Sequence, residues 1–305
     1  MSSKKDGYVD QHIVPKSYLN RFATLGRNNK TYRIGVRQKD LTHYIDSTDH
    51  VGYIKKYYDD DSCDDIKKWE HFYDKEIEVP LSKVINKLIT GLTLSNYTDG
   101  FLTTEDRRVL SRFFYTQFVR VPQFIDCQIT NCKEILLPSI KQKCLMRFGA
   151  KYAEVINKVR IDDKDIKHLT LDYLNDNEQL ERFSRLLLDK PWIVYINGCR
   201  DFLPFITSDN PIVLSNIISH SNSRTDNGLG NRETIIFCPI NSYIGIGIYP
   251  NQFYRFFDDI QYTVISNQDI QFIGKMNCCE LSQCYNQAFI PVNFFKEIYK
   301  EEHFE

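Results

Sequence analysis

The stretch PWIVYING, residues 191–198, separates a helical part of the chain from a β-rich part. Five successive apolar residues follow its proline, which favours a buried strand, and the Asn-Gly pair that ends it is typical of a tight turn. Upstream, apolar residues recur every three or four positions, as amphipathic helices require. Downstream, they form short runs separated by turn residues. The sequence therefore predicts a change from helices to strands near residue 190.

Helical spacing fills the middle of the chain, from residue 63 to residue 188, with breaks. Pro80 interrupts the first helical run, so we expect a kink or two helices there. A second helix should begin at Thr103, where acidic residues occupy the first turn, and should end near Pro122. After residue 198, further strands are predicted at 205–207, 212–214, 235–237, 243–249 and 288–292, with a helix at 268–284.

These patterns predict an α+β fold in a single domain, residues 1–305. A helical body, residues 61–189, packs on a mixed or antiparallel sheet built mainly from the C-terminal third, residues 190–305, which also carries a late helix. Residues 1–60 are expected to form short extended pieces, with a strand at 31–36, and to pack where the body meets the sheet. A cleft at that junction is the default position of a functional site.

The overall composition argues against several classes of protein. Lys and Arg total 39 and Asp and Glu total 40, which is unlike a globally basic nucleic-acid binder. The nine Cys residues include no Cys-x-x-Cys pair and indicate reduced thiols rather than a disulfide scaffold or a zinc finger. No apolar stretch is long enough for a membrane helix, and the polar first eight residues hold no signal core. We therefore expect a cytoplasmic protein with no membrane partner.

Three segments resemble parts of one protein family. QHIVPKSYLNRF, residues 11–22, resembles the Gln-His-x-x-Pro-x-x-Tyr-Leu-x-x-Phe opening of the bacterial domain-of-unknown-function family 4238. An aromatic helix with Gln117 three residues before Arg120, and the loop TSDNP at 207–211, are similar to later segments of the same family. The resemblance extends over residues 11–290. It implies no particular activity, and it directs attention to the polar residues of these segments.

His12 is the first candidate catalytic residue. Pro15 favours an extended backbone before it, and an imidazole on a rigid segment suits acid–base chemistry or metal ligation because its ordinary pKa is near neutrality. Gln11 and Lys16, close to it in the sequence, are candidate substrate-binding residues. The alternative is structural: His12 binds a backbone carbonyl and pins the N-terminal segment.

The loop at 207–211 supplies the second group of candidates. We interpret Asp209 as a catalytic base, an orienter of His12 or a metal ligand, and Ser208 and Asn210 as substrate-binding residues, because loops at strand ends commonly carry sites. Ser-Asp-Asn-Pro is equally good turn chemistry, in which the Asp and Asn side chains bond to their own backbone.

Gln117 and Arg120 share one face of the aromatic helix. Gln117 is a candidate catalytic residue, and Arg120 is suited to bind a phosphate or carboxylate through two N–H groups. Alternatively, Arg120 is buried and paired to an acid such as Asp209 or Glu78.

Glu78 is also a candidate metal ligand, together with Asp209 or with His71 and Asp74, which share its helix face. Lysines lie among these residues, so a solvated, charged helix surface explains the same pattern.

These candidates together predict a hydrolase that acts on a phosphodiester, a nuclease-like effector in a bacterial defence or toxin setting. In this hypothesis His12 is the acid or base, Arg120 and Lys16 neutralise phosphate charge, and a divalent metal is the cofactor that Glu78 and Asp209 would hold. The partner would be nucleic acid. One alternative is a binding or sensor module for a small anionic ligand or a peptide, and another is a partner subunit of a complex.

Overall fold

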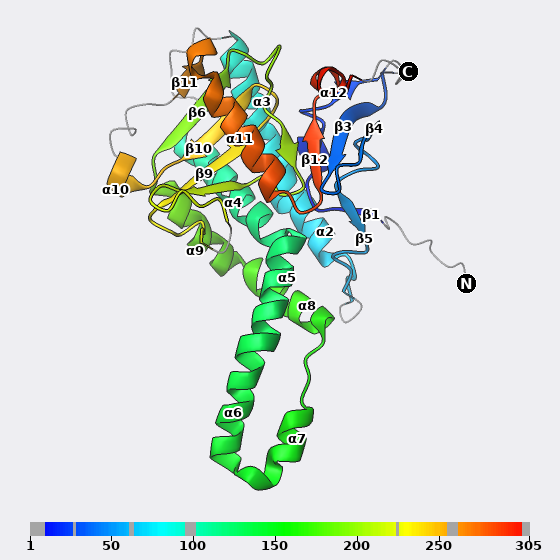
Figure 1. The fold of residues 1–305 in the computed structure, drawn as a ribbon, viewed down its shortest axis with the longest axis vertical. Coiled ribbons are helices and arrows are strands. Elements are labelled where there is room, and N and C mark those ends of the chain that lie inside the picture. The colour runs from blue at the N-terminus through cyan, green and yellow to red at the C-terminus, as the bar shows by residue number, and fades with distance from the viewer. Residues whose placement is uncertain are drawn as a thin grey trace, which may run out of the picture.

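The computed structural model describes residues 10–26, 29–60, 64–94, 102–223, 226–254 and 262–300. The fold is α+β, as the sequence predicts, with the helices concentrated in the middle of the chain. Figure 1 shows a body of sheets and helices from which two helices project well away from the remainder.

The middle of the chain is helical, as its apolar spacing predicts. In order, it contains α2 (Lys68–Phe72), the π-helical turn η1 (Tyr73–Glu78), α3 (Val79–Leu94), α4 (Thr104–Arg120), α5 (Pro122–Asn131), the π-helical turn η2 (Cys132–Leu136), α6 (Leu137–Phe148), the 3-10 turn η3 (Ala150–Tyr152), α7 (Ala153–Lys158), α8 (Asp163–Leu174) and α9 (Asn177–Leu188).

Helix α4 begins and ends where the sequence indicates. The Thr103 hydroxyl accepts from the Asp106 N–H, and the Asp106 carboxylate accepts from the Thr103 N–H at 2.9 Å, which forms a capping box. Val121 has extended backbone, and Pro122 is the first residue of α5, where its missing N–H has no structural cost.

The helical run divides near Pro80 into two helices, α2 and α3, which a π-helical turn just before the proline joins. A proline cannot donate to the carbonyl four residues back, and its ring collides with that carbonyl in a regular α-helix. In η1 the Val79 N–H instead donates to the carbonyl of Asp74, five residues back. The same happens before Pro138, where the Leu137 N–H donates to Cys132 in η2.

A mixed five-stranded sheet is built from the C-terminal third, as predicted. Its order is β11 (Tyr262–Ile265), β6 (Trp192–Asn197), β10 (Ile244–Ile248), β9 (Thr234–Pro239) and β8 (Val213–Asn216). Only the β11–β6 pair is parallel.

A second sheet combines strands from the two ends of the chain, which the sequence does not predict. Its order is β2 (Thr24–Leu25), β3 (Tyr32–Gln38), β12 (Gln287–Ile290) and β7 (Thr207–Ser208), and β4 (His43–Ser47) pairs with β3. A separate two-stranded ribbon joins β1 (Asp10–His12) to β5 (Tyr53–Lys55).

The remaining helical elements are short or lie at the C-terminal end. They are α1 (Lys16–Leu19), α10 (Asn251–Tyr254), the 3-10 turn η5 (Asn267–Asp269), α11 (Ile270–Gln283) and α12 (Val292–Tyr299). Among the described residues, no helix is both long enough and apolar enough to span a membrane.

Aromatic contacts hold α4 against its neighbours. Phe114 stacks on Trp192 of β6 with ring centroids 5.7 Å apart, and Phe113 contacts Tyr18 of α1 at 5.8 Å. Tyr18 is fully buried, and its hydroxyl donates to the Pro239 carbonyl of β9 and meets the Thr207 hydroxyl of β7 at 2.9 Å. One side chain of the N-terminal segment therefore joins both five-stranded sheets.

We expect Tyr18→Phe to lower the free energy of unfolding by about 1–3 kcal/mol, because the buried carbonyl of Pro239 loses its donor. Urea denaturation measures this change. The matched control is Tyr32→Phe, at an exposed strand position, which should stay within about 0.5 kcal/mol of wild type. Equal stabilities of the two variants would show that the Tyr18 hydroxyl does not hold the sheets together.

Candidate active site

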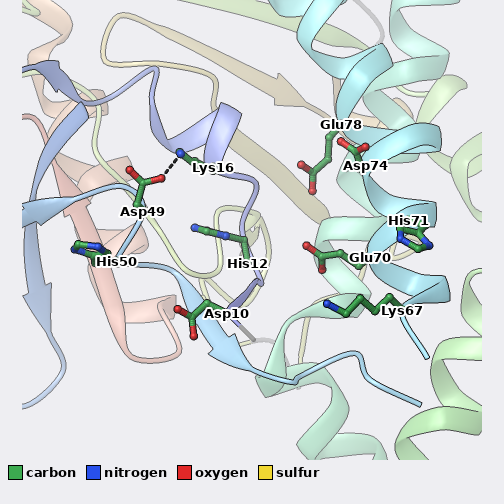
Figure 2. A pocket seen from close by; sticks show the side chains of 10 residues that line it. All are labelled: Asp10, His12, Lys16, Asp49, His50, Lys67, Glu70, His71, Asp74 and Glu78. Carbon is green, nitrogen blue, oxygen red and sulfur yellow. Dashed lines mark hydrogen bonds and ion pairs between the residues drawn. The ribbon is translucent and has the colours of Figure 1, made fainter. Parts of the chain in front are cut away.

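A pocket of about 730 Å³ lies between the N-terminal segment and α2–η1. Figure 2 shows its two walls. The N-terminal wall consists of Asp10, His12, Lys16, Asp49 and His50, and the helical wall consists of Lys67, Glu70, His71, Asp74 and Glu78.

The backbone and ring of His12 are held in place by neighbouring strands and turns. His12 ends β1 and lies opposite Tyr53 of β5, and the next residue, Ile13, donates its N–H to the Gly52 carbonyl. The His12 Nε2 lies 3.2 Å from the Thr48 carbonyl. A carbonyl only accepts, so Nε2 carries the proton in the neutral ring, and Nδ1 is the bare nitrogen. No described residue hydrogen-bonds to Nδ1.

The environment of His12 favours its neutral form. Burial lowers the pKa of the ring below its ordinary value of 6.5, and the positive charges of Lys16 and Arg120 lower it further, although the bond to Thr48 opposes the change. A neutral imidazole with a free Nδ1 is able to accept a proton near neutral pH.

Two glutamates of the helical wall point across the pocket toward His12 (Figure 2). Burial raises the pKa of Glu78 above its ordinary value of 4.5, and Arg120 opposes this. Burial also raises the pKa of Glu70, and the negative charge of Glu78 adds to the effect. These two carboxyl groups therefore retain protons at a higher pH than exposed glutamates do.

Arg120 lies buried behind Glu78 and is 1% exposed. Its Nη1 lies 3.4 Å from Glu78 Oε1, its Nε donates to Gln117 Oε1 at 2.9 Å, and its guanidinium lies 4.8 Å from the centre of the Tyr73 ring. Its Nη2 is buried and has no hydrogen-bond partner in the described part of the chain. The Tyr58 hydroxyl, which lies close to the Arg120 guanidinium, is also buried without a hydrogen-bond partner in the described part of the chain.

Gln117 connects Arg120 to the N-terminal wall. Its Nε2 donates to the carbonyl of Ile13 at 2.8 Å, and it is fully buried. Gln117 therefore positions Arg120 and the His12 segment, and it does not line the pocket.

Gln11 and Lys16 have different surroundings. Gln11 is fully buried, and its amide bonds to Asp59 and to the Tyr58 N–H, so it does not face the pocket. Lys16 lines the pocket and is paired with Asp49 at the surface.

The loop with Ser208, Asp209 and Asn210 lies elsewhere, and none of the three lines this pocket. The Asp209 carboxylate accepts from the backbone N–H groups of residues 285, 286 and 287, all at 2.7–2.8 Å. Ser208 donates to Glu280 at 2.6 Å, and Asn210 donates to the Gln283 carbonyl at 2.8 Å. These bonds anchor the loop to the distant residues 280–287 rather than to its own backbone, whereas the Asn210 N–H, which donates to the Ser208 hydroxyl at 3.2 Å, makes a local bond of the turn type that we gave as the alternative.

The structure does not bring Asp209 and Glu78 together as a metal site. Asp209 is committed to backbone N–H groups, although burial raises its pKa to about 6. Within the described ranges, no three His, Cys, Asp or Glu side chains are arranged to hold a metal ion. Of the two acids proposed as partners of Arg120, Glu78 makes the contact.

Five pocket residues are not among the candidates from the sequence, namely Asp10, Asp49, His50, Lys67 and Glu70, and Glu70 is the carboxylic acid among them that enters the proposed chemistry. Regular α-helical spacing places residues 71, 74 and 78 on one face. The wider turn of η1 changes this rotation, so that Glu70 and Glu78 face the pocket together (Figure 2). Pro80, two residues beyond η1, is the signal that could have identified this change.

The comparisons with known proteins agree with the sequence segments. Residues 10–291 match the family model described as "Protein of unknown function (DUF4238)". The chain belongs to this family. No curated protein and no solved structure matches it. In this DUF4238 member, the three segments that carry the resemblance supply His12, the Gln117–Arg120 pair and the Asp209 anchor.

The lowered pKa of His12 predicts a pH-dependent stability. Below pH 6.5 the unfolded chain takes up a proton that the folded ring resists, so wild type should lose stability between pH 7.5 and 5.5. The variant His12→Gln lacks this titrating group, so its free energy of unfolding should fall less than that of wild type over the same pH range. Urea denaturation at both pH values measures it, with His50→Gln, an exposed histidine of the same wall, as the matched control. An identical pH dependence in wild type and His12→Gln would contradict the buried, neutral state of His12.

Proposed function

We propose that the protein is a hydrolase that acts on a phosphodiester in this pocket. The observation that carries the proposal is the pairing of a neutral His12, whose Nδ1 is free, with two carboxyl groups of raised pKa that face it. Environments that push the pKa values of neighbouring groups in opposite directions are typical of acid–base catalysis.

In the proposed step, a water molecule attacks the phosphorus atom and gives its proton to His12 Nδ1. The bond from phosphorus to the leaving oxygen breaks, and that oxygen takes the proton of Glu70 or Glu78. Arg120, buried behind Glu78, supplies positive charge at the back of the pocket, and Lys16 and Lys67, which line it, are the cations that reach the phosphate. The products are a phosphomonoester and an alcohol.

The charge of the pocket depends on the protons of the two glutamates. With both ionised, five carboxylates face Lys16 and Lys67, and an anionic substrate is repelled. With both protonated, three aspartates remain, and Lys16, Lys67 and the nearby Arg120 balance them. Protonation of Glu78 also removes the negative charge that offsets Arg120, so more of the positive charge of the buried guanidinium acts on the pocket.

Nucleic acid is the phosphodiester substrate that we propose, in a nuclease-like effector of bacterial defence or a toxin. A divalent metal remains part of the proposal as an ion that arrives with the phosphate, in which case an ionised Glu78 would be its ligand and Glu70 would be the acid. Assays with Mg²⁺, with Mn²⁺ and with a chelator test that part.

A second candidate function is a binding module without turnover. It is favoured by the excess of carboxylates in the pocket at neutral pH, which suits a basic peptide better than an anion. Binding of an oligolysine peptide that is lost in a Glu70→Gln/Glu78→Gln variant, without hydrolysis of any phosphodiester, would support this function.

We expect wild type to cleave single-stranded RNA or DNA, or the model ester bis(p-nitrophenyl) phosphate, and His12→Gln to lower kcat at least about 100-fold because the base is lost. His43→Gln, at an exposed histidine that does not line the pocket, is the matched control and should keep wild-type turnover. Urea denaturation of both variants shows that they fold. Equal turnover by His12→Gln and wild type would refute the catalytic role.

The two pKa shifts predict an acidic pH optimum. His12 must be neutral, which requires a pH above its lowered pKa, and a glutamate must be protonated, which requires a pH below its raised pKa. Burial lowers the pKa of His12 and raises that of Glu78, so the two groups hold their required forms together over a wider pH range than exposed side chains would. A bell-shaped profile of kcat/KM with an acidic maximum is expected, and an optimum above pH 7.5 would contradict the assignment.

A further inference from the structure

A helical arm, residues 132–161, projects from the body of the protein (Figure 1). It consists of η2, α6, η3, α7 and the segment that leads to α8. Helix α6 runs outward from α5, and α7 returns along it. The Lys141 ammonium group donates to the Asn157 carbonyl at 3.0 Å, which ties the two halves together.

The arm exposes an unusual share of large apolar side chains. Eight of the 22 such exposed side chains among the described residues belong to it, although it has only 30 residues. They are Ile135, Leu136, Ile140, Met146, Phe148, Tyr152, Val155 and Val159. Exposed apolar groups gathered on one projection mark an interaction surface.

The arm is also strongly basic. It contains seven Lys or Arg and two Glu, in a chain whose formal net charge is −1. Near its turn, Arg147 lies 5.6 Å from the centre of the Phe148 ring and Lys151 lies 5.0 Å from that of Tyr152. Met146 is 75% exposed beside them. The tip of the arm, residues 143–152, therefore combines apolar side chains with cations.

We propose that this tip docks on the surface of an anionic phospholipid bilayer. Cations next to the tip meet the lipid phosphates, and the apolar and aromatic side chains enter the boundary between headgroups and acyl chains. Such binding needs no membrane-spanning helix, so it agrees with the short helices of the arm.

The side-chain chemistry favours lipid over other anionic partners. Met146 neither stacks on bases nor forms hydrogen bonds, so nucleic acid would leave it in water, whereas a bilayer covers it. A second copy of the same arm carries the same positive charge and would be repelled.

Co-sedimentation with vesicles tests the proposal. Wild type should bind phosphatidylcholine vesicles that contain about 30% phosphatidylglycerol at least tenfold more tightly than vesicles of phosphatidylcholine alone. Lys143→Gln/Arg147→Gln/Lys151→Gln should weaken this binding about 100-fold, about fivefold for each cation removed. Met146→Ser/Phe148→Ser should weaken binding to the same vesicles, because the apolar contacts are lost.

The matched control is Phe202→Ser/Ile218→Ser, which removes two exposed apolar side chains of the body and should bind as wild type does. Equal binding of wild type and both arm variants would overturn the proposal. Two other results would also overturn it. One is that the protein does not bind vesicles and its arm binds DNA or RNA. The other is that light scattering shows a wild-type dimer that is lost in the arm variants.

Discussion

The buried guanidinium of Arg120 is the group around which the walls of the pocket are organised. A charge removed from water needs partners that replace its hydration, and removing one partner of such a group typically costs about 3–5 kcal/mol. Arg120 finds these partners in Gln117, Glu78 and the Tyr73 ring. Gln117 also holds the backbone beside His12. Helix α4, turn η1 and the N-terminal segment therefore meet at a single cation, and the position of each wall depends on the other.

The three family segments are mutually dependent for the same reason, although they are far apart in the sequence. The first contacts the second through the Ile13 carbonyl and Gln117, and it contacts the third through the hydroxyls of Tyr18 and Thr207. Most of their polar atoms hold backbone groups in place. Several polar atoms of these segments are not used in this anchoring, among them Nδ1 of His12, a residue that lines the pocket, and Nη2 of Arg120, which is buried behind it.

Local patterns in the sequence predict the elements that depend on local physics. The strand at 191–198 and the helix that starts at Thr103 are examples, because apolar runs, turn residues and caps act over a few residues. The pairing of β12 with β3 could not be predicted, since it joins segments about 250 residues apart. For His12 the structural and the catalytic interpretations are compatible, because one ring nitrogen anchors the segment and the other is free.

The near-zero net charge of the chain conceals two opposite local excesses. Carboxylates outnumber lysines around the pocket, and cations outnumber acids on the arm. In physiological salt, the field of a surface charge decays over about 8 Å. Helix α6 alone, with 12 residues, is about 18 Å long at the usual rise per residue, so the far end of the arm lies more than two such lengths from its base. The acidic pocket therefore does not cancel the potential of the tip, and the total charge excludes only a uniformly basic surface.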